Sequence, residues 1–278
     1  MSVRTSVDFV DADRVSVADR GFAYGDGLFE TLRIAGGRVP LWPRHEARLR
    51  HGCERLHLPL PDMIAVLAEV RRLSGGIADG VARVTYSRGE GERGYAPPAS
   101  PRPTVVVTVS PLALQAAPYD DGIAVRLCDT RLASQPLLAG LKHLNRLEQV
   151  MARAEWDDPA LGEGLMLDMD DQVVCATAAN LFAVFDGRLV TPPLDACGVA
   201  GVARAEILAV RDVALARMNL ARLAEADEVF LTSAVRGILP VRVLASRSWQ
   251  PGPVIRALQA HWRDIGLPLP AGSKDSHR

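Results

Sequence analysis

A proline-bearing, polar segment near the middle of the chain, PLALQAAPYDDG at residues 111–122, most restricts how this sequence can fold. On both sides of it, short runs rich in β-branched residues are interspersed with runs whose apolar residues recur at helical spacing. The segment itself has neither period, as expected of a connection between domains. The 278 residues are enough for two domains of ordinary size. We therefore expect an N-terminal domain at residues 1–113, a linker at about 114–121 and a C-terminal domain at 122–278.

Each expected domain contains both strands and helices. In the first, the pattern predicts a hairpin around Gly36-Gly37 at 28–42, helices at 42–58 and 62–73, and strands at 80–88 and 102–110. In the second, it predicts a strand at 123–130, a helix at 146–158 opened by an Asn145/Glu148 capping box, three short strands between 164 and 190, a helix at 201–217, a strand at 227–232 and a helix at 252–265. Because hairpin-like connections are frequent, we expect an α/β (α+β) fold with mixed or antiparallel sheets.

Composition excludes several classes of partner. The formal net charge is −1, which offers nucleic acid or an acidic membrane no electrostatic attraction. The four cysteines form no CxxC pair and the six histidines form no HxxxH or HExxH pattern, so we expect neither a metal site nor a disulfide framework. The first residues lack an apolar targeting core, and no apolar run reaches the length of a membrane span. We expect a cytoplasmic protein whose ligand is a small molecule.

Lys142 is unusual in this chain. Lysine and arginine together number 32, and all but Lys142 and Lys274 are arginine. Lys142 stands between apolar residues, in LLAGLKHLNRL, three residues before the expected helix start, and both the apolar surroundings and the helix dipole disfavour a charged amine there. An arginine cannot lose its proton in a protein, whereas a neutral lysine can attack a carbonyl and form a Schiff base. Lys142 is therefore a candidate catalytic amine, and the alternative is a surface lysine without a role.

A second candidate is the glycine-rich stretch RGEGERGY, which contains Gly89, Gly91 and Gly94 in the spacing GxGxxG. A dinucleotide-binding loop requires a helix directly after the glycines. Here the chain continues as YAPPASPRP, whose prolines are incompatible with a helix. We expect a flexible, functional loop rather than a nucleotide site.

The segment DACGVAGVARAEIL at 195–208 is a better candidate for anion binding. Gly198 and Gly201 precede a strong helical pattern, so the backbone N–H groups of Val202 and Ala203 would emerge from a helix N-terminus. Such N–H groups bind phosphate or carboxylate. An ordinary glycine-containing turn before a helix remains the alternative.

Five segments, taken in order, resemble one enzyme family. They are DRGFAYGDGLFETLR at 19–33, LKHLNRLEQV at 141–150, AANLF at 178–182, GVAGVAR at 198–204 and LTSAVRGILPV at 231–241. Together they resemble the fold type IV pyridoxal-phosphate enzymes, which include the D-amino-acid and branched-chain aminotransferases. The segment KHLNRLEQV is most similar to the branch formed by the aminodeoxychorismate lyases. The resemblance extends from about residue 8 to residue 245.

The resemblance implies roles for individual residues. Lys142 matches the lysine that binds pyridoxal 5'-phosphate covalently and moves protons, and Arg48 matches the arginine that binds the cofactor phosphate. The other matched positions are Val202 and Ala203 at the helix N-terminus beside that phosphate, Ser233 and Ala234 in a second phosphate loop, and Tyr24, Arg93 and Tyr95 in segments that line the substrate pocket. For these last three, ordinary packing is the alternative. The family also implies a homodimer.

Cys175 departs from the family pattern. Family members usually have a glutamate five residues before the asparagine of AANLF, where it pairs with the pyridine nitrogen of the cofactor. This chain has Cys175 at that position, and no acidic residue lies between Asp171 and Asp186 to replace it. Either Cys175 is the partner of the cofactor ring or the alignment slips here.

The resemblance implies a lyase that converts 4-amino-4-deoxychorismate to 4-aminobenzoate and pyruvate, a step toward folate. The first alternative is an aminotransferase of the same fold, acting on D-amino or branched-chain acids. The second is a binding or scaffold protein that kept the fold and lost the chemistry, which the presence of Lys142 disfavours.

Overall fold

The computed structural model describes residues 3–270 and groups them into two compact units. The first unit runs up to Ala113 and also includes Leu141–Asn145, and the second comprises Leu114–Gly140 and the chain from Arg146 onward. Two features differ from the expected domains. The expected linker belongs to the second unit, where it contains the short helix α4 (Ala117–Asp120). The segment of Lys142 belongs to the first unit rather than to the C-terminal one.

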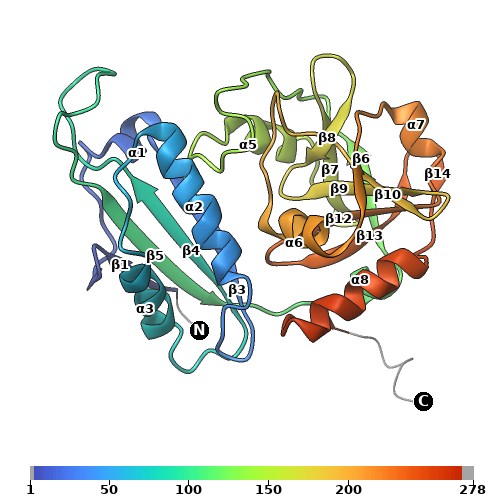
Figure 1. The fold of residues 1–278 in the computed structure, drawn as a ribbon, viewed down its shortest axis with the longest axis horizontal. Helices are drawn as coiled ribbons and strands as arrows, with labels where there is room; N and C mark the ends of the chain where they lie inside the picture. The colour runs from blue at the N-terminus through green and yellow to red at the C-terminus, as the bar shows by residue number, and fades with distance from the viewer. Residues whose placement is uncertain (1–2, 271–278) are drawn as a thin grey trace. The chain divides into compact units, whose positions relative to one another are not determined.

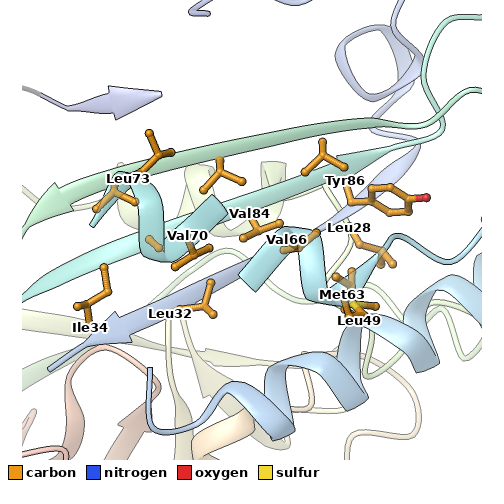
Figure 2. Close-up of a cluster of buried hydrophobic side chains, with 14 of the residues drawn as sticks. Leu28, Leu32, Ile34, Leu49, Met63, Val66, Val70, Leu73, Val84 and Tyr86 are labelled. Atoms are coloured by element: carbon orange, nitrogen blue, oxygen red, sulfur yellow. The ribbon is translucent and has the colours of Figure 1, made fainter. Parts of the chain in front are cut away.

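The first unit is an antiparallel sheet covered on one face by two helices (Figure 1). Its strand order is β2-β1-β5-β4-β3. The strands are β1 (Arg4–Val7), β2 (Val10–Asp11), β3 (Gly27–Ile34), β4 (Gly80–Ser87) and β5 (Thr104–Pro111), and the helices are α1 (Arg20–Tyr24), α2 (Trp42–Leu56) and α3 (Met63–Leu73). Alternate residues of β3, β4 and β5 pack against apolar residues of α2 and α3, as Figure 2 shows for Leu32, Val66 and Val84. Apolar residues recur every second position in these strands and every three or four positions in these helices. These two spacings are why the sequence predicted most of these elements.

The expected hairpin at 28–42 is half right. Its first arm is β3, and Gly36 and Gly37 form the turn with positive φ angles of 54° and 71°. Beyond a single bridge between Ala35 and Arg38 there is no second strand. Pro40 has no N–H group to donate to a ladder, and α2 begins two residues later.

The second unit is built on a mixed nine-stranded sheet (Figure 1). Its strand order is β11-β10-β9-β12-β13-β6-β7-β8, with β14 on β13. The strands are β6 (Ile123–Leu127), β7 (Leu161–Leu167), β8 (Val173–Ala176), β9 (Asn180–Phe185), β10 (Arg188–Thr191), β11 (Val213–Leu215), β12 (Glu228–Ser233), β13 (Gly237–Leu244) and β14 (Arg247–Ser248). Because β8 pairs with β9 as well as with β7, the strands from β9 to β8 close into a ring. Its remaining helices are α5 (Leu147–Arg153), α6 (Val202–Val210), α7 (Leu220–Ala224) and α8 (Pro253–Asp264).

Two expected helices in this unit are shorter than predicted. The helix expected at 146–158 is α5, which ends at Arg153, and its N-cap is Arg146 without a side-chain cap. The expected capping box is absent because the Asn145 side chain donates to Gly25 O and Glu148 accepts from Ala133 N. The helix expected at 201–217 ends at Val210, because the chain turns extended and pairs as β11 with β10. The structure confirms the predicted mixed α/β class and its antiparallel and mixed sheets.

Within residues 3–270, no helix combines the length and apolar character that crossing a membrane requires. The same part of the chain contains no group of three or more histidine, cysteine or acidic side chains arranged to hold a metal ion.

Candidate functional site

The lysine segment extends the sheet of the first unit. Phe29 N donates to Lys142 O at 2.9 Å, Leu144 N donates to Gly27 O at 3.0 Å, and Leu28 forms an antiparallel bridge with His143. These bonds place Lys142 beside the edge strand β3. Its Nζ lies 4.1 Å from the centre of the Phe29 ring, where a cation is attracted by the face of the aromatic system. Lys142 therefore stands at a defined position on a strand edge.

A buried charged cluster occupies the helix-facing side of the same strand. Glu30 is 2% exposed, and it accepts hydrogen bonds from Arg48 Nε at 2.8 Å and from Arg48 Nη2. His45 Nδ1 lies 2.6 Å from Glu30 Oε2, the same oxygen that accepts from Arg48 Nη2. His45 and Arg48 are three positions apart on α2, so both side chains face Glu30. We call Glu30, His45 and Arg48 the carboxylate cluster.

The charge states in the carboxylate cluster follow from burial and pairing. Burial alone would raise the pKa of Glu30, but the Arg48 guanidinium and the hydrogen bonds from Arg48 and His45 lower it to about 2. Burial lowers the pKa of His45, and its contact with Glu30 opposes that shift. Arg48 was expected to bind phosphate, and the structure shows one edge of its guanidinium engaged by Glu30. The guanidinium carries five N–H donors, so a second acceptor at another edge is compatible with this pairing.

In the second unit, Asn180 connects most of the other predicted residues. It is the first residue of β9 and pairs with Cys175 on β8 and with Thr232 on β12. Its Oδ1 accepts from Gly201 N at 3.1 Å, and its Nδ2 donates to Val199 O at 2.9 Å. A Cβ on Gly201 would lie 2.1 Å from Asn180 Oδ1, so this close approach requires glycine.

The turn held by Asn180 leads directly into α6. Gly198 has φ of +85°, and Gly140 pairs with the turn through bonds to Gly198 O and from Ala200 N. Gly201 is the N-cap of α6, and no side chain caps the helix. Val202 and Ala203 are buried at its first turn. A nine-residue helix with an uncapped N-terminus presents N–H groups that suit a phosphate.

The second predicted loop lies beside this turn. Ser233 ends β12 and its Oγ accepts from Arg236 N at 3.2 Å, and Ala234 follows it. Thr232, opposite Asn180, is 1% exposed, and its Oγ1 has no hydrogen-bond partner within residues 3–270. A buried hydroxyl without a protein partner is rare and fits a site that receives a polar ligand. The α6 N-terminus and the Thr232 hydroxyl are thus donors of the kind that bind a phosphate.

Cys175 is a neutral thiol in this arrangement. It is 6% exposed and packs in an apolar cluster with Trp156 of the chain after α5 and Met166 of β7. Burial raises the pKa of Cys175 to about 12, with Cys197 and Glu163 adding to the rise and Arg146 opposing it. A neutral thiol is only a weak hydrogen-bond partner.

The three predicted substrate residues lie in the first unit. The ring centres of Tyr24 and Tyr95 are 5.5 Å apart, and the Tyr24 hydroxyl accepts from Gly94 N at 3.1 Å. Arg93 is exposed in the same loop. The structure therefore brings Tyr24 to the loop that carries the other two.

Sequence reasoning did not single out Glu30, His45 or Asn180. Glu30 stands in FETLR, where a charged residue at an inward position between Leu28 and Leu32 breaks the apolar alternation. That break was the available signal, because a buried carboxylate needs a partner. Asn180 opens a strand that is otherwise entirely apolar, which is a similar signal.

The chain is similar to known proteins along most of its length. Residues 27–244 match the family described as amino-transferase class IV. An aminodeoxychorismate lyase from Vibrio harveyi is 38% identical over 240 residues, covering 82% of this chain and 86% of the relative. A crystal structure of 4-amino-4-deoxychorismate lyase from Pseudomonas aeruginosa superposes with a TM-score of 0.89 at 49% identity, covering 94% of this chain and 98% of that one. A branched-chain amino acid aminotransferase structure from Escherichia coli shares the fold, with a TM-score of 0.84 at 21% identity over 98% and 97% of the two chains.

Proposed function

We propose that this chain, which belongs to the aminotransferase class IV family, is a lyase that converts 4-amino-4-deoxychorismate to 4-aminobenzoate and pyruvate with pyridoxal 5'-phosphate. The observation that carries the proposal is the 49% identity to the Pseudomonas aeruginosa lyase along nearly the whole of both chains. The family in general uses pyridoxal phosphate, and the uncapped α6 N-terminus and the amine beside β3 fit its phosphate and its aldehyde.

Bound pyridoxal phosphate would supply an aldehyde that links covalently to an amine and withdraws electrons from the carbon beside it. Lys142 would be the residue that holds the cofactor through Nζ, and its free amine would be the base that takes the proton from the amine-bearing carbon of the substrate. The bond between the neighbouring ring carbon and the enolpyruvyl oxygen would then break, with its electron pair going to that oxygen. The enolpyruvate would take up a proton and become pyruvate, and the ring would become aromatic, which makes the reaction strongly downhill.

The remaining predicted residues would bind and orient. The N–H groups of Val202 and Ala203, with Ser233 and Ala234, would bind the cofactor phosphate. Arg48 would add a charge to the same anion. Tyr24, Arg93 and Tyr95 would contact the substrate, whose two carboxylates suit an arginine.

We propose Cys175 as the residue beside the cofactor ring. A buried neutral thiol, unlike a carboxylate, does not stabilise a proton on a pyridine nitrogen. Transamination depends more on that proton than elimination does. Cys175→Glu should therefore raise side transamination more than pyruvate release, measured as the ratio of the two product classes.

The decisive experiment follows both products and the labelled residue. The purified protein, loaded with pyridoxal phosphate, should release pyruvate and 4-aminobenzoate from 4-amino-4-deoxychorismate in equal amounts. Borohydride should then fix the cofactor to one peptide containing Lys142, and Lys142→Arg should abolish both labelling and turnover while the protein remains folded. Labelling at Lys274, which lies outside the described residues, would contradict the assignment.

An aminotransferase is the second candidate function. It is favoured by a putative branched-chain-amino-acid aminotransferase from Methanocaldococcus jannaschii, which is 31% identical over 93% of both chains. If the protein transfers the amino group of D-alanine or leucine faster than it releases pyruvate from aminodeoxychorismate, this candidate replaces the lyase.

We further propose that the enzyme acts in the cytoplasm, in folate synthesis, as a homodimer. Three large apolar side chains of α5 in the second unit are exposed, namely Leu147, Val150 and Met151. Such a group of apolar residues is typical of an interaction surface. Light scattering on the purified protein should give twice the chain mass of 29.9 kDa.

A further inference from the structure

The glycine-rich loop at residues 89–96 is bonded along its first half to the segment that opens α1. Arg20 N donates to Gly89 O at 2.8 Å, Gly91 N donates to Ala18 O at 3.3 Å, and Asp19 forms a bridge with Glu90. We call residues 89–96 the glycine loop. Its sequence alone predicted a flexible segment, whereas these bonds give its first half a defined path.

The second half of the glycine loop is held by one guanidinium group. The Arg20 side chain is 5% exposed, although it stands on a five-residue helix at the surface of the unit. Its Nη1 donates to Gly94 O at 3.0 Å and Ala96 O at 3.2 Å, and its Nη2 donates to Tyr95 O at 2.9 Å. Three consecutive carbonyl groups therefore accept from a single side chain. A lysine could not reproduce this, because its three donors radiate from one atom.

Arg20 is itself fixed to the body of the first unit. Its Nε donates to Asp26 Oδ2 at 2.9 Å, and Arg88 Nε donates to the same oxygen at 2.8 Å. Burial works against the charge of Asp26, but the two arginines together keep its pKa below the usual range. Arg88 in turn donates to the carbonyls of Leu56 and His57 at the end of α2. The glycine loop is thus connected through Arg20 to a packed helix.

The anchored conformation determines which groups face outward. Tyr24 lies under the Arg20 guanidinium, 5.0 Å from its carbon to the ring centre, and accepts from Gly94 N. Tyr95 uses its carbonyl for Arg20, and its side chain is 86% exposed. The Arg93 side chain is also exposed. Arg20 therefore binds the main chain of the glycine loop, while the side chains of Arg93 and Tyr95 remain exposed and the Tyr95 ring lies 5.5 Å from that of Tyr24.

We infer that Arg20 is a positioning residue, which fixes the main chain at residues 94–96 and so holds Arg93 and Tyr95 in one conformation for an anionic substrate. The inference rests on the proposed function, because it deepens the role of those two residues. Without the anchor, the glycine loop would adopt several conformations, and only one of them would bind substrate. The apparent affinity for substrate would then be the affinity of that conformation multiplied by the fraction of molecules that adopt it.

The first test measures the anchor without any reaction. Arg93 is a trypsin site within the loop, so limited proteolysis of the pyridoxal-phosphate-loaded protein reports how often the loop opens. Arg20→Lys keeps the charge but loses the three-carbonyl contact, and we expect cleavage after Arg93 to become about tenfold faster. Arg50→Lys is the matched control, since Arg50 pairs with Glu46 on the exposed side of α2, and it should leave the cleavage rate unchanged.

The second test separates substrate binding from the other steps. In Arg20→Lys we expect KM for aminodeoxychorismate to rise about tenfold and kcat to change less than about twofold, because the substrate residues are intact but less ordered. Affinity for pyridoxal phosphate should be unchanged. If Arg20→Lys does not fold, Gly91→Ala is a second variant that displaces the Arg20 side chain from within the glycine loop. The added Cβ would lie 2.8 Å from Arg20 Cδ, which is too close for the side chain to keep its position. It should change both readouts in the same direction.

Two outcomes overturn the inference. Cleavage after Arg93 at the wild-type rate in Arg20→Lys would show that Arg20 does not hold the loop. Faster cleavage with an unchanged KM would show that the loop conformation does not serve substrate binding. Failure of the proposed function is distinguishable, because wild-type protein would then release no pyruvate at all, while the proteolysis result would stand by itself.

Discussion

Glu30 shows how a single buried residue on β3 requires charged partners around it. It occupies an inward position of β3 that would ordinarily be apolar, and it is compensated there by Arg48 and His45. A buried carboxylate without these partners would be protonated or would destabilise the fold. The carboxylate cluster therefore couples the stability of the first unit to pH.

We predict an acid-dependent loss of stability that Glu30→Gln reduces. The pKa of Glu30 is about 2 in the folded protein and near 4.5 in the unfolded chain, so its contribution is present above pH 4.5 and is lost as the pH falls toward 2. The full difference is roughly 3 kcal/mol of unfolding free energy. Urea denaturation at decreasing pH should show a steeper loss for the wild type than for Glu30→Gln. Parallel pH profiles below pH 4.5 would contradict the paired carboxylate.

Arg48 should matter for stability before it matters for any ligand. Arg48→Ala leaves Glu30 buried without its main partner, and breaking such a pair costs about 3–5 kcal/mol. Arg50→Ala, two residues along on the exposed side of α2, is the control and should cost no more than about 0.5 kcal/mol. Denaturant titration of both variants measures the difference. Equally small losses of unfolding free energy in the two variants would show that Glu30 does not need Arg48. The main role of Arg48 would then be to bind an anion.

At the scale of elements, the start of α6 depends on a bond made by a different strand. Asn180 of β9 holds both ends of the Val199–Gly201 turn, and without it Gly201 N and Val199 O lose their partners. Each such orphaned group costs about 1–3 kcal/mol. The orientation of the α6 N–H groups is therefore set by the strand ring rather than by the helix itself.

We predict that Asn180→Ala weakens binding of pyridoxal phosphate to the apoprotein about tenfold, because a disordered turn no longer aims the α6 N–H groups. Asn219→Ala is the matched control, since Asn219 caps α7, where its side chain accepts from Arg222 N. It should lower stability by about 1 kcal/mol and leave the affinity unchanged. Equal affinities for the two variants would remove the α6 N-terminus from the proposed phosphate site.

At the scale of the whole molecule, all four cysteines are buried free thiols. Burial raises the pKa of Cys53, Cys128 and Cys175 to about 12 and that of Cys197 to about 11. The thiolate is the reactive form, so neither access nor ionisation favours modification at neutral pH. Their reactivity therefore reports the opening of the fold.

We predict that the native protein at pH 8 reacts with a thiol-specific reagent at the rate of unfolding, and that four thiols react at once in denaturant. Counting the released chromophore with and without denaturant measures this. A single thiol that reacts rapidly in the native apoprotein and is protected by pyridoxal phosphate would instead reveal an open cofactor site, and peptide mapping would show whether it is Cys175.

The sequence by itself determined most elements and singled out Lys142 as a candidate catalytic amine. The apolar periods of α2, α3 and β4 are local, and they match the structure to within one or two residues at each end. Lys142 was found from its rarity and its apolar neighbours, both of which are properties of the sequence. Five short motifs in order identified the family that the comparisons then showed.

Only the tertiary structure decided features that depend on residues distant in the chain. Sequence reasoning missed β13, whose Pro240 argues against a central strand, and the strand is tolerated between β12 and β6 with a register shift after Val241. It placed Lys142 in the second domain, whereas the bonds to β3 assign the segment to the first unit. It also read the glycine loop as flexible. Periodicity reports which face of an element is buried, but hydrogen-bond partners that lie tens of residues away in the chain, such as those of Arg20 and Asn180, exist only once the fold brings them together.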